Sequence, residues 1–205
     1  MEKNKFILLY RIFFTVLSWF TIFLFLFIGI FTYGSIIPWV ISLKYYTLQS
    51  NILVTVWFSL AIIWHNKPEK LEKLMGNVKG AFTLYITVTF LVFAVVLAPL
   101  YHPTGLAAFS NIVLHYITPI AFIVDFLLTE TKIKYQWKSF VYWFIYPLCY
   151  LAFAIIHGIF TGDYLYPFLN IDFLGFPFFI MSLCILILFF IGLGSIFVVI
   201  NRKKD

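Results

Sequence analysis

The stretch FILLYRIFFTVLSWFTIFLFLFIGIF, residues 6–31, decides the fold class. Its only charged residue is Arg11, and a helix needs roughly 20 mostly apolar residues to cross the hydrocarbon core of a bilayer. The basic residues before it resemble the start of a signal peptide, but the apolar run is too long and no small-residue cleavage site follows it. We therefore expect a retained membrane-spanning helix.

The rest of the chain repeats this pattern. Hydrophobic residues make up 63% of it and charged residues 11%, whereas a soluble protein is roughly half apolar and a quarter charged. The sequence predicts an all-α polytopic membrane protein, a bundle of six helices that forms a single domain over residues 1–205. The other predicted spans are 45–64, 78–97, 108–128, 140–160 and 174–200.

The basic residues predict the orientation, because lysine and arginine collect in short cytoplasmic loops. With six spans, all but Lys44 of the 14 lysines and arginines fall on one side, Lys79 being counted with the loop before the third span. Both termini are therefore expected in the cytoplasm. The net charge of +6 then faces the anionic inner leaflet, so no nucleic-acid partner is expected. The loop HNKPEKLEKLMGN, residues 65–77, is expected to form a short surface helix.

Polar side chains inside the predicted spans mark candidate sites, because each is costly in hydrocarbon. Near the start of the second span, Thr47, Ser50 and Asn51 follow i, i+3, i+4 spacing and share one helix face. In the fourth span, Asn111 and His115 share a face in the same way. The sequence therefore predicts polar stripes that turn toward the interior of the bundle.

The depth of these residues separates two groups. At about 1.5 Å per residue, Thr47, His115 and His157 lie in the outer third of the membrane. Asp125 lies roughly 15 Å deeper than His115 and so cannot orient its imidazole. We expect Asp125 to form a structural ion pair with Arg11 near the cytoplasmic end.

The outer group contains the two core parts of acyl transfer. A threonine hydroxyl needs a positioned base to attack an ester, and a neutral histidine is such a base. Thr47 and His115 are therefore the candidates for these two roles. The amide of Asn51, or the backbone amides at the helix start, is expected to stabilise an oxyanion. The further polar groups predicted in the pocket are Ser50, Asn111 and His157.

Other interpretations of these residues stay open. Thr47 is also placed to satisfy the first amides of its helix, and Ser50 and Asn51 to hydrogen-bond between helices. Pro119 has no amide hydrogen for the carbonyl of His115 four residues earlier, so a kink and a free carbonyl are expected there. The sequence suggests no metal site and no cofactor.

Three short segments resemble one family. KYYT (44–47), LHYITPIAFIVDFLL (114–128) and YPFLN (166–170) are similar to the androgen-induced-gene family of six-span membrane proteins, and the chain looks closest to its bacterial branch. The resemblance implies a threonine hydrolase that cleaves fatty acid esters of hydroxy fatty acids, in a bacterial cell membrane. By position, it places the nucleophile at Thr47 and the catalytic histidine at His115. Family members tend to have an acid where this chain has Asn170, with Asp172 two residues on as a further pocket residue.

Two other functions compete with a lipid-ester hydrolase. A small transporter or channel would use His115, His157 and Asp125 as a proton or ligand path, since these residues span both halves of the bilayer. A lipid-binding protein without catalysis would use the polar stripes only to join helices. In each case the membrane is the immediate partner, and for the hydrolase the substrate is a lipid or fatty-acyl ester.

Overall fold

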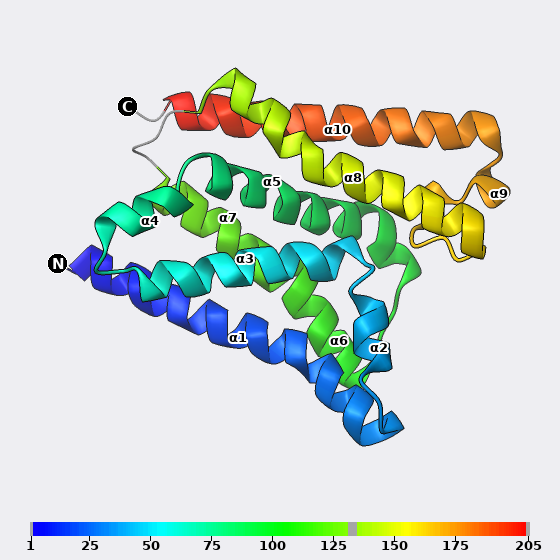
Figure 1. The fold of residues 1–205 in the computed structure, drawn as a ribbon, viewed down its shortest axis with the longest axis horizontal. Helices are drawn as coiled ribbons and strands as arrows, with labels where there is room; N and C mark the ends of the chain where they lie inside the picture. The colour runs from blue at the N-terminus through cyan, green and yellow to red at the C-terminus, as the bar shows by residue number, and fades with distance from the viewer. Residues whose placement is uncertain (1, 131–134, 204–205) are drawn as a thin grey trace. The chain divides into compact units, whose positions relative to one another are not determined.

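A computed structural model describes residues 2–130 and 135–203. The described residues are mostly helical and contain no strand (Figure 1). Six of the helical segments are long and apolar enough to cross a membrane: Asn4–Tyr33, Tyr46–Ile63, Asn77–Leu100, Gly105–Thr129, Phe140–Thr161 and Phe176–Arg202. The prediction of an all-α bundle with six spans is therefore confirmed. Lys132, Lys134 and Lys204, which contribute to the predicted orientation, lie outside the described residues.

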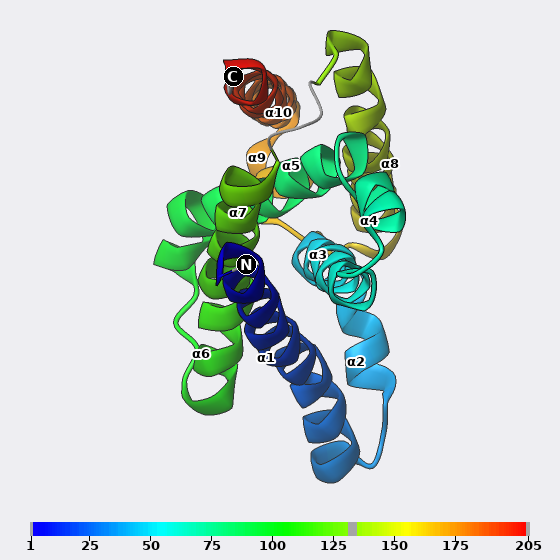
Figure 2. The ribbon, with the colours of Figure 1, turned by 90° about the vertical axis from the view of Figure 1, so that its left-hand side faces the viewer.

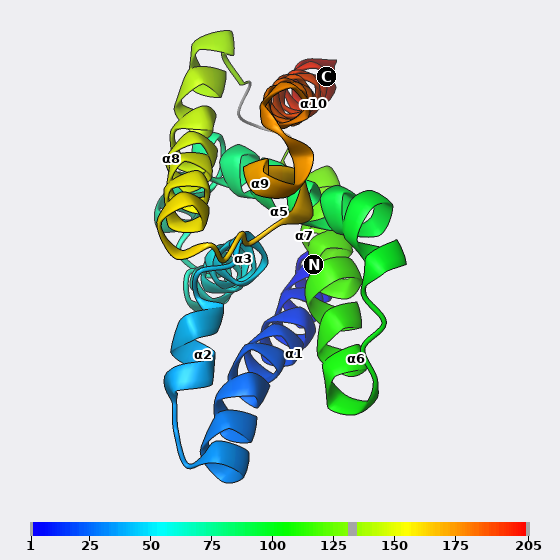
Figure 3. The ribbon, with the colours of Figure 1, turned by 90° about the vertical axis from the view of Figure 1, so that its right-hand side faces the viewer.

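The chain divides into two compact units, Met1–Ile133 and Lys134–Asp205. The N-terminal unit contains four long elements, α1 (Glu2–Tyr33), α3 (Tyr46–Ile63), α5 (Asn77–Val92) and α7 (Thr118–Thr129). In this unit α3 packs against α1 and α5, and α7 packs against α5 and α1. Figures 2 and 3 view these helices from opposite ends. The four helices therefore enclose a common interior.

Shorter elements complete the N-terminal unit. The helix α2 (Ile37–Ser42) connects α1 to α3, and α6 (Gly105–Ile112) begins the fourth span. The helix α4 (Pro68–Leu74) forms within residues 65–77, which confirms the predicted short helix of that loop. Aromatic rings fill part of the interior, where Trp57, Phe58 and Phe122 meet edge to face.

Two of the spans are interrupted by π-helical turns. The third span continues from α5 into η1 (Phe93–Leu97) and then into the 3₁₀ turn η2 (Ala98–Leu100). The fourth span runs from α6 through η3 (Val113–Ile117) into α7. A π turn inserts one extra residue and is frequent at functional sites, so both turns are candidate positions for functional residues.

The C-terminal unit is a helical hairpin of α8 (Trp137–Thr161) and α10 (Phe176–Lys203). The helix α8 ends at Gly162, whose φ of 72° is left-handed, and the 3₁₀ turn η4 (Pro167–Leu169) and α9 (Ile171–Leu174) follow. The hydroxyl of Ser182 in α10 donates to the carbonyl of Phe168 at 2.6 Å and so holds η4 to α10.

Gly194 of α10 lies against the ring of Phe140 of α8. A Cβ atom added at Gly194 would meet that ring at 1.9 Å, whereas one added at Gly192 would meet no atom within 4 Å. The two glycines share a helix, so they form a matched pair for testing the contact.

We expect Gly194→Ala to lower the thermal unfolding midpoint of the protein in detergent, because overpacking costs roughly 1–3 kcal/mol. Gly192→Ala is the control and should leave the midpoint unchanged or raise it, because alanine meets no atom there and is favoured over glycine in a helix interior by roughly 0.5–1 kcal/mol. Circular dichroism at rising temperature measures both. Equal midpoints for the two variants would contradict the close approach of Gly194 to Phe140.

Candidate functional site

The structure brings Thr47 and His115 together. Thr47 lies in the first turn of α3 and His115 in the π turn η3, and their Oγ1 and Nε2 atoms are 3.3 Å apart. Both side chains are partly exposed. The two residues predicted as nucleophile and base are thus within reach of a hydrogen bond, although they are 68 residues apart in the sequence.

The other nitrogen of His115 determines the direction of this hydrogen bond. Its Nδ1 lies 3.0 Å from the main-chain oxygen of Asn111, which can only accept. Nδ1 therefore carries the proton, and in the neutral imidazole Nε2 is left as an acceptor. The hydroxyl of Thr47 then donates to Nε2, which is the arrangement that a general base needs.

Phe93 is a neighbour of His115 that the sequence did not identify. Its ring, from η1, stacks on the imidazole with 3.7 Å between ring centroids and 22° between planes. Phe93 is 4% exposed, and with the Asn111 carbonyl it leaves the imidazole little rotational freedom. Nothing in the sequence distinguishes it among 27 phenylalanines, because the stacking depends on the packing of α5 against η3.

The π turn changes which carbonyl Pro119 leaves free. The amide of Thr118 donates to Val113, five residues earlier, so the hydrogen bonds have shifted by one residue. The next amide in this register would serve Leu114, but residue 119 is proline and has none. The carbonyl of Leu114 therefore has no helical donor in this register, and the free carbonyl expected at His115 stays a prediction.

Asn51 supplies the missing donor. Its Nδ2 donates to the carbonyl of Leu114 at 2.9 Å and to the carbonyl of Thr47 at 2.8 Å. Both partners only accept, so the amide nitrogen must face them and both its hydrogens are used. Asn51 is also 0% exposed. The prediction that its amide stabilises an oxyanion is wrong, because no donor remains.

Ser50 has a similar structural role. Its hydroxyl donates to the Thr47 carbonyl at 3.1 Å and lies 2.7 Å from the hydroxyl of Thr89 in α5. Since Ser50 is 0% exposed, its predicted place among the exposed polar groups of a pocket is wrong. Asn111 acts through its main-chain oxygen on His115, while its Oδ1 is buried without a hydrogen-bond partner among the described residues.

The remaining candidates for an oxyanion are the first amides of α3. A helix has no internal acceptor for the amides of its first turn, and that end carries partial positive charge. The amides of Thr47 and Leu48 belong to this turn, and the N-cap residue Tyr45 makes no side-chain capping bond to them. These amides lie beside the Thr47 hydroxyl. The helix-start amides, predicted above as the alternative to the Asn51 amide, therefore stay candidates for oxyanion donors.

His157 and Asp172 belong to the C-terminal unit, where they make local contacts. Nδ1 of His157 lies 2.9 Å from the carbonyl of Asp163 and donates to it across the turn after α8. Asp172 is exposed and accepts a hydrogen bond from Tyr164; desolvation and this carboxylate raise the pKa of the Tyr164 phenol. The contacts of both residues stabilise loops of this unit, and their predicted role in a pocket stays a prediction.

Asn170 stands where the resemblance leads us to expect an acid. Its side-chain oxygen accepts from the amide of Phe173 at 3.0 Å and caps the N-terminus of α9. Asparagine and aspartate cap helices about equally well, so this local role accounts for either residue type at the position.

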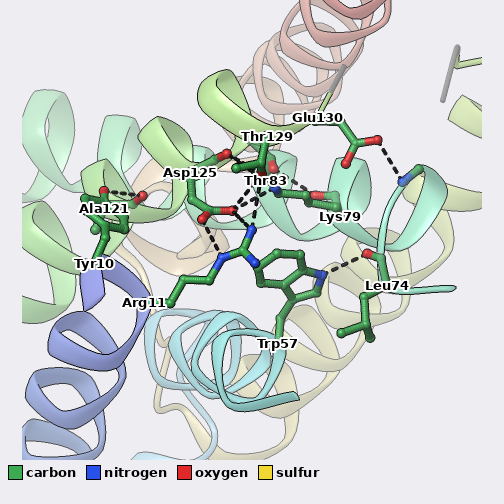
Figure 4. Close-up of polar contacts among 11 residues, drawn as sticks. Tyr10, Arg11, Trp57, Leu74, Lys79, Thr83, Ala121, Asp125, Thr129 and Glu130 are labelled. Carbon is green, nitrogen blue, oxygen red and sulfur yellow. Dashed lines mark hydrogen bonds and ion pairs between the residues drawn. The ribbon is translucent and has the colours of Figure 1, made fainter. Parts of the chain in front are cut away.

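A second polar cluster surrounds Asp125 (Figure 4). Nε of Arg11 lies 2.7 Å from Oδ1, and the Nη2 atom donates to Oδ2 at 3.1 Å, so the predicted ion pair is present and bidentate. Lys79 adds a second cation, with its Nζ 2.7 Å from Oδ2. Lys79 is 0% exposed, so its assignment to the basic loop before the third span is wrong.

The cluster also includes uncharged groups. The hydroxyl of Thr129 accepts from both Lys79 and Arg11. The Arg11 guanidinium lies 5.0 Å and the Lys79 ammonium 4.6 Å from the centroid of the Trp57 ring, whose indole nitrogen donates to Leu74. Residues from α1, α3, α5 and α7 thus meet around one carboxylate. Both oxygens of Asp125 contact a cation, and these contacts favour the ionised carboxylate. A carboxylate held in this way is a poor relay for protons along a transport path.

Comparison with known proteins returned no match: no family model, no curated protein and no solved structure matches the chain. The chemistry of the site therefore rests on its own residues. Within the ranges 2–130 and 135–203, no group of three or more His, Cys, Asp or Glu side chains could hold a metal ion.

The Asp125 cluster predicts an order of stabilities. Asp125→Asn removes the carboxylate that both Arg11 and Lys79 contact and should cost roughly 3–5 kcal/mol of unfolding free energy. Lys79→Met should cost less, because it leaves a neutral pair of Arg11 and Asp125. Thermal unfolding in detergent ranks the variants, with the exposed Lys70→Met as control. A larger loss in Lys79→Met than in Asp125→Asn would contradict this account.

Proposed function

We propose that the protein is an intramembrane hydrolase of lipid esters, with Thr47 as nucleophile and His115 as general base. The observation that carries the proposal is the 3.3 Å contact between Thr47 Oγ1 and His115 Nε2, with Nδ1 held by the Asn111 carbonyl. A hydroxyl that donates to a neutral imidazole of fixed tautomer is the activated form of a weak nucleophile.

The reaction follows from this geometry in two steps. As Oγ1 of Thr47 attacks the ester carbonyl, Nε2 of His115 takes the hydroxyl proton, and it returns that proton to the leaving alkoxide as the acyl-threonine forms. A water molecule then attacks the acyl-threonine and gives a proton to Nε2. That proton passes back to Oγ1 as the carboxylic acid leaves, and Thr47 and His115 are regenerated.

The imidazolium formed in each step has neutral partners. The Asn111 carbonyl accepts its Nδ1–H, and the face of Phe93 lies against the ring, where an aromatic ring favours a cation. A carboxylate in the place of that carbonyl would stabilise the cation more strongly. We therefore expect a lower catalytic rate than in a triad that contains an acid. In return, the site needs no buried negative charge beside the substrate.

The charge that develops on the substrate oxygen has donors at the start of α3. The amides of Thr47 and Leu48 lack acceptors in their helix, and the partial positive charge of the helix end favours an anion. Because they belong to the same turn as the nucleophile, no separate element is needed to position them.

The substrate class follows from the surroundings and from the resemblance. The site lies in a span rich in apolar residues, so long acyl chains reach it from the bilayer. The resemblance to the androgen-induced-gene family favours fatty acid esters of hydroxy fatty acids. The basic loops favour both termini in the cytoplasm and the site in the outer half of the membrane, and the resemblance favours a bacterial cell membrane. A proton-coupled transporter has less support, because Asp125 is held by two cations.

Hydrolysis of a hydroxy-fatty-acid ester by the purified protein in detergent tests the proposal. We expect wild-type protein to release the free acid, Thr47→Ala to be inactive, and His115→Ala to lose roughly 10²–10⁴-fold in kcat with its general base. Thr47→Ser keeps a hydroxyl at the same place and should retain part of the rate.

Two exposed residues of the same types are the matched controls. Thr32→Ala and His102→Ala should hydrolyse the ester at the wild-type rate. Full activity in Thr47→Ala and His115→Ala would exclude this mechanism, and the absence of turnover of any lipid ester by the wild type would exclude the function. A bound acyl chain whose head group lies far from Thr47 would favour lipid binding without catalysis.

A further inference from the structure

One buried side chain connects the nucleophile to the base. The carboxamide of Asn51 donates one hydrogen to the main-chain oxygen of Thr47 and the other to that of Leu114, at 2.8 and 2.9 Å. Thr47 is the proposed nucleophile, and Leu114 immediately precedes the proposed base, His115. One amide group therefore joins the helix start that carries Thr47 to the turn that carries His115.

The need for this amide arises in the backbone of η3. In the π register of this turn, the Thr118 amide serves Val113, and Pro119 has no amide for Leu114. Leu114 is 5% exposed, so water does not easily supply the donor. A buried carbonyl without a donor would favour a return to α-helical hydrogen bonding, in which Thr118 serves Leu114. That return would rotate His115 relative to Thr47.

Few residue types meet the requirement. The site needs two donors on one short, uncharged group, and a serine or threonine hydroxyl offers one while a carboxylate offers none. Oδ1 of Asn51 is buried without a hydrogen-bond partner in the described part of the chain, which costs desolvation free energy. The side chain therefore contributes only through its two N–H donors. Ser50 adds a further donor to the Thr47 carbonyl but reaches nothing in η3 at hydrogen-bond distance.

We infer that Asn51 is a positioning residue for ester hydrolysis: it holds the π turn that carries His115 in register with the helix start that carries Thr47. This inference rests on the proposed function. Asn51 does not contact the substrate, since its side chain is fully buried. Asn51 acts by keeping the Thr47 hydroxyl and the His115 Nε2 at hydrogen-bond distance with the correct tautomer.

The decisive variant is Asn51→Asp, which has nearly the same shape. It replaces the NH2 group and its two N–H donors by a carboxylate oxygen that faces two carbonyl oxygens. Displacement of reacting groups by about 1 Å costs on the order of 10²-fold in rate. We expect Asn51→Asp and Asn51→Leu to lose at least that factor in kcat, with KM changed less than threefold. Asn66→Asp, at an exposed position after α3, is the matched control and should keep the wild-type kcat.

Pro119→Ala separates this role from a general loss of structure. It returns an amide to residue 119, which can then serve the Leu114 carbonyl without Asn51. We therefore expect Asn51→Leu combined with Pro119→Ala to regain at least tenfold in kcat over Asn51→Leu alone. Pro119→Ala in the wild-type background should change kcat by less than threefold. A double variant no faster than Asn51→Leu would overturn the inference.

A readout that needs no activity distinguishes this inference from the proposed function. Nitrogen NMR of protein labelled at histidine, with His115 assigned from His115→Gln, reports which ring nitrogen carries the proton. We expect the Nδ1–H form in the wild type and a mixture in Asn51→Asp. If the wild type hydrolyses no ester, the proposed function fails, and the spectrum still decides whether Asn51 holds the tautomer. An unchanged spectrum in a folded Asn51→Asp protein would overturn the inference.

Discussion

The N-terminal unit depends on the carboxylate of Asp125. A charge buried in a medium of low dielectric must be compensated by close opposite charge, and for Asp125 this comes from Arg11 of α1 and Lys79 of α5, both at 2.7 Å. Trp57 of α3 lies under both cations. Because none of these groups can stay buried alone, α1, α3, α5 and α7 must converge at this point.

The proposed site is built by the same constraint acting on an uncharged group. The carbonyl of Leu114 has lost its helical donor to Pro119 and to the shift of register in η3, and the apolar surroundings supply none. Asn51 donates to it and thereby draws the start of α3 against η3. Thr47 and His115 are carried on these two segments. Their contact therefore follows from the hydrogen bond between the Asn51 amide and the Leu114 carbonyl. The geometry of the proposed site and the convergence of the helices at Asp125 therefore have one physical cause, the need to partner buried polar groups.

The histidine of this site is oriented by a carbonyl, where soluble hydrolases commonly use a carboxylate. The choice suits a membrane, since a second acid near His115 would need its own cation, as Asp125 does. The Asn111 carbonyl and the Phe93 ring orient the imidazole without adding charge. For the proposed hydrolase, the expected consequence is a modest rate on a lipid substrate that would be concentrated in the bilayer.

The sequence by itself determined the six apolar helices and the pairing of Arg11 with Asp125, because hydropathy, helical period and depth are local properties of the chain. The choice of Thr47 and His115 rested on the family resemblance together with their similar depth. The register of the π turn, the burial of Lys79 and the stacking of Phe93 could not be predicted in this way. Nor could the direction of the Asn51 amide, which serves two carbonyls rather than a substrate oxygen. Each of these depends on atoms from helices distant in sequence, and only the packed tertiary structure decides which buried polar group meets which partner.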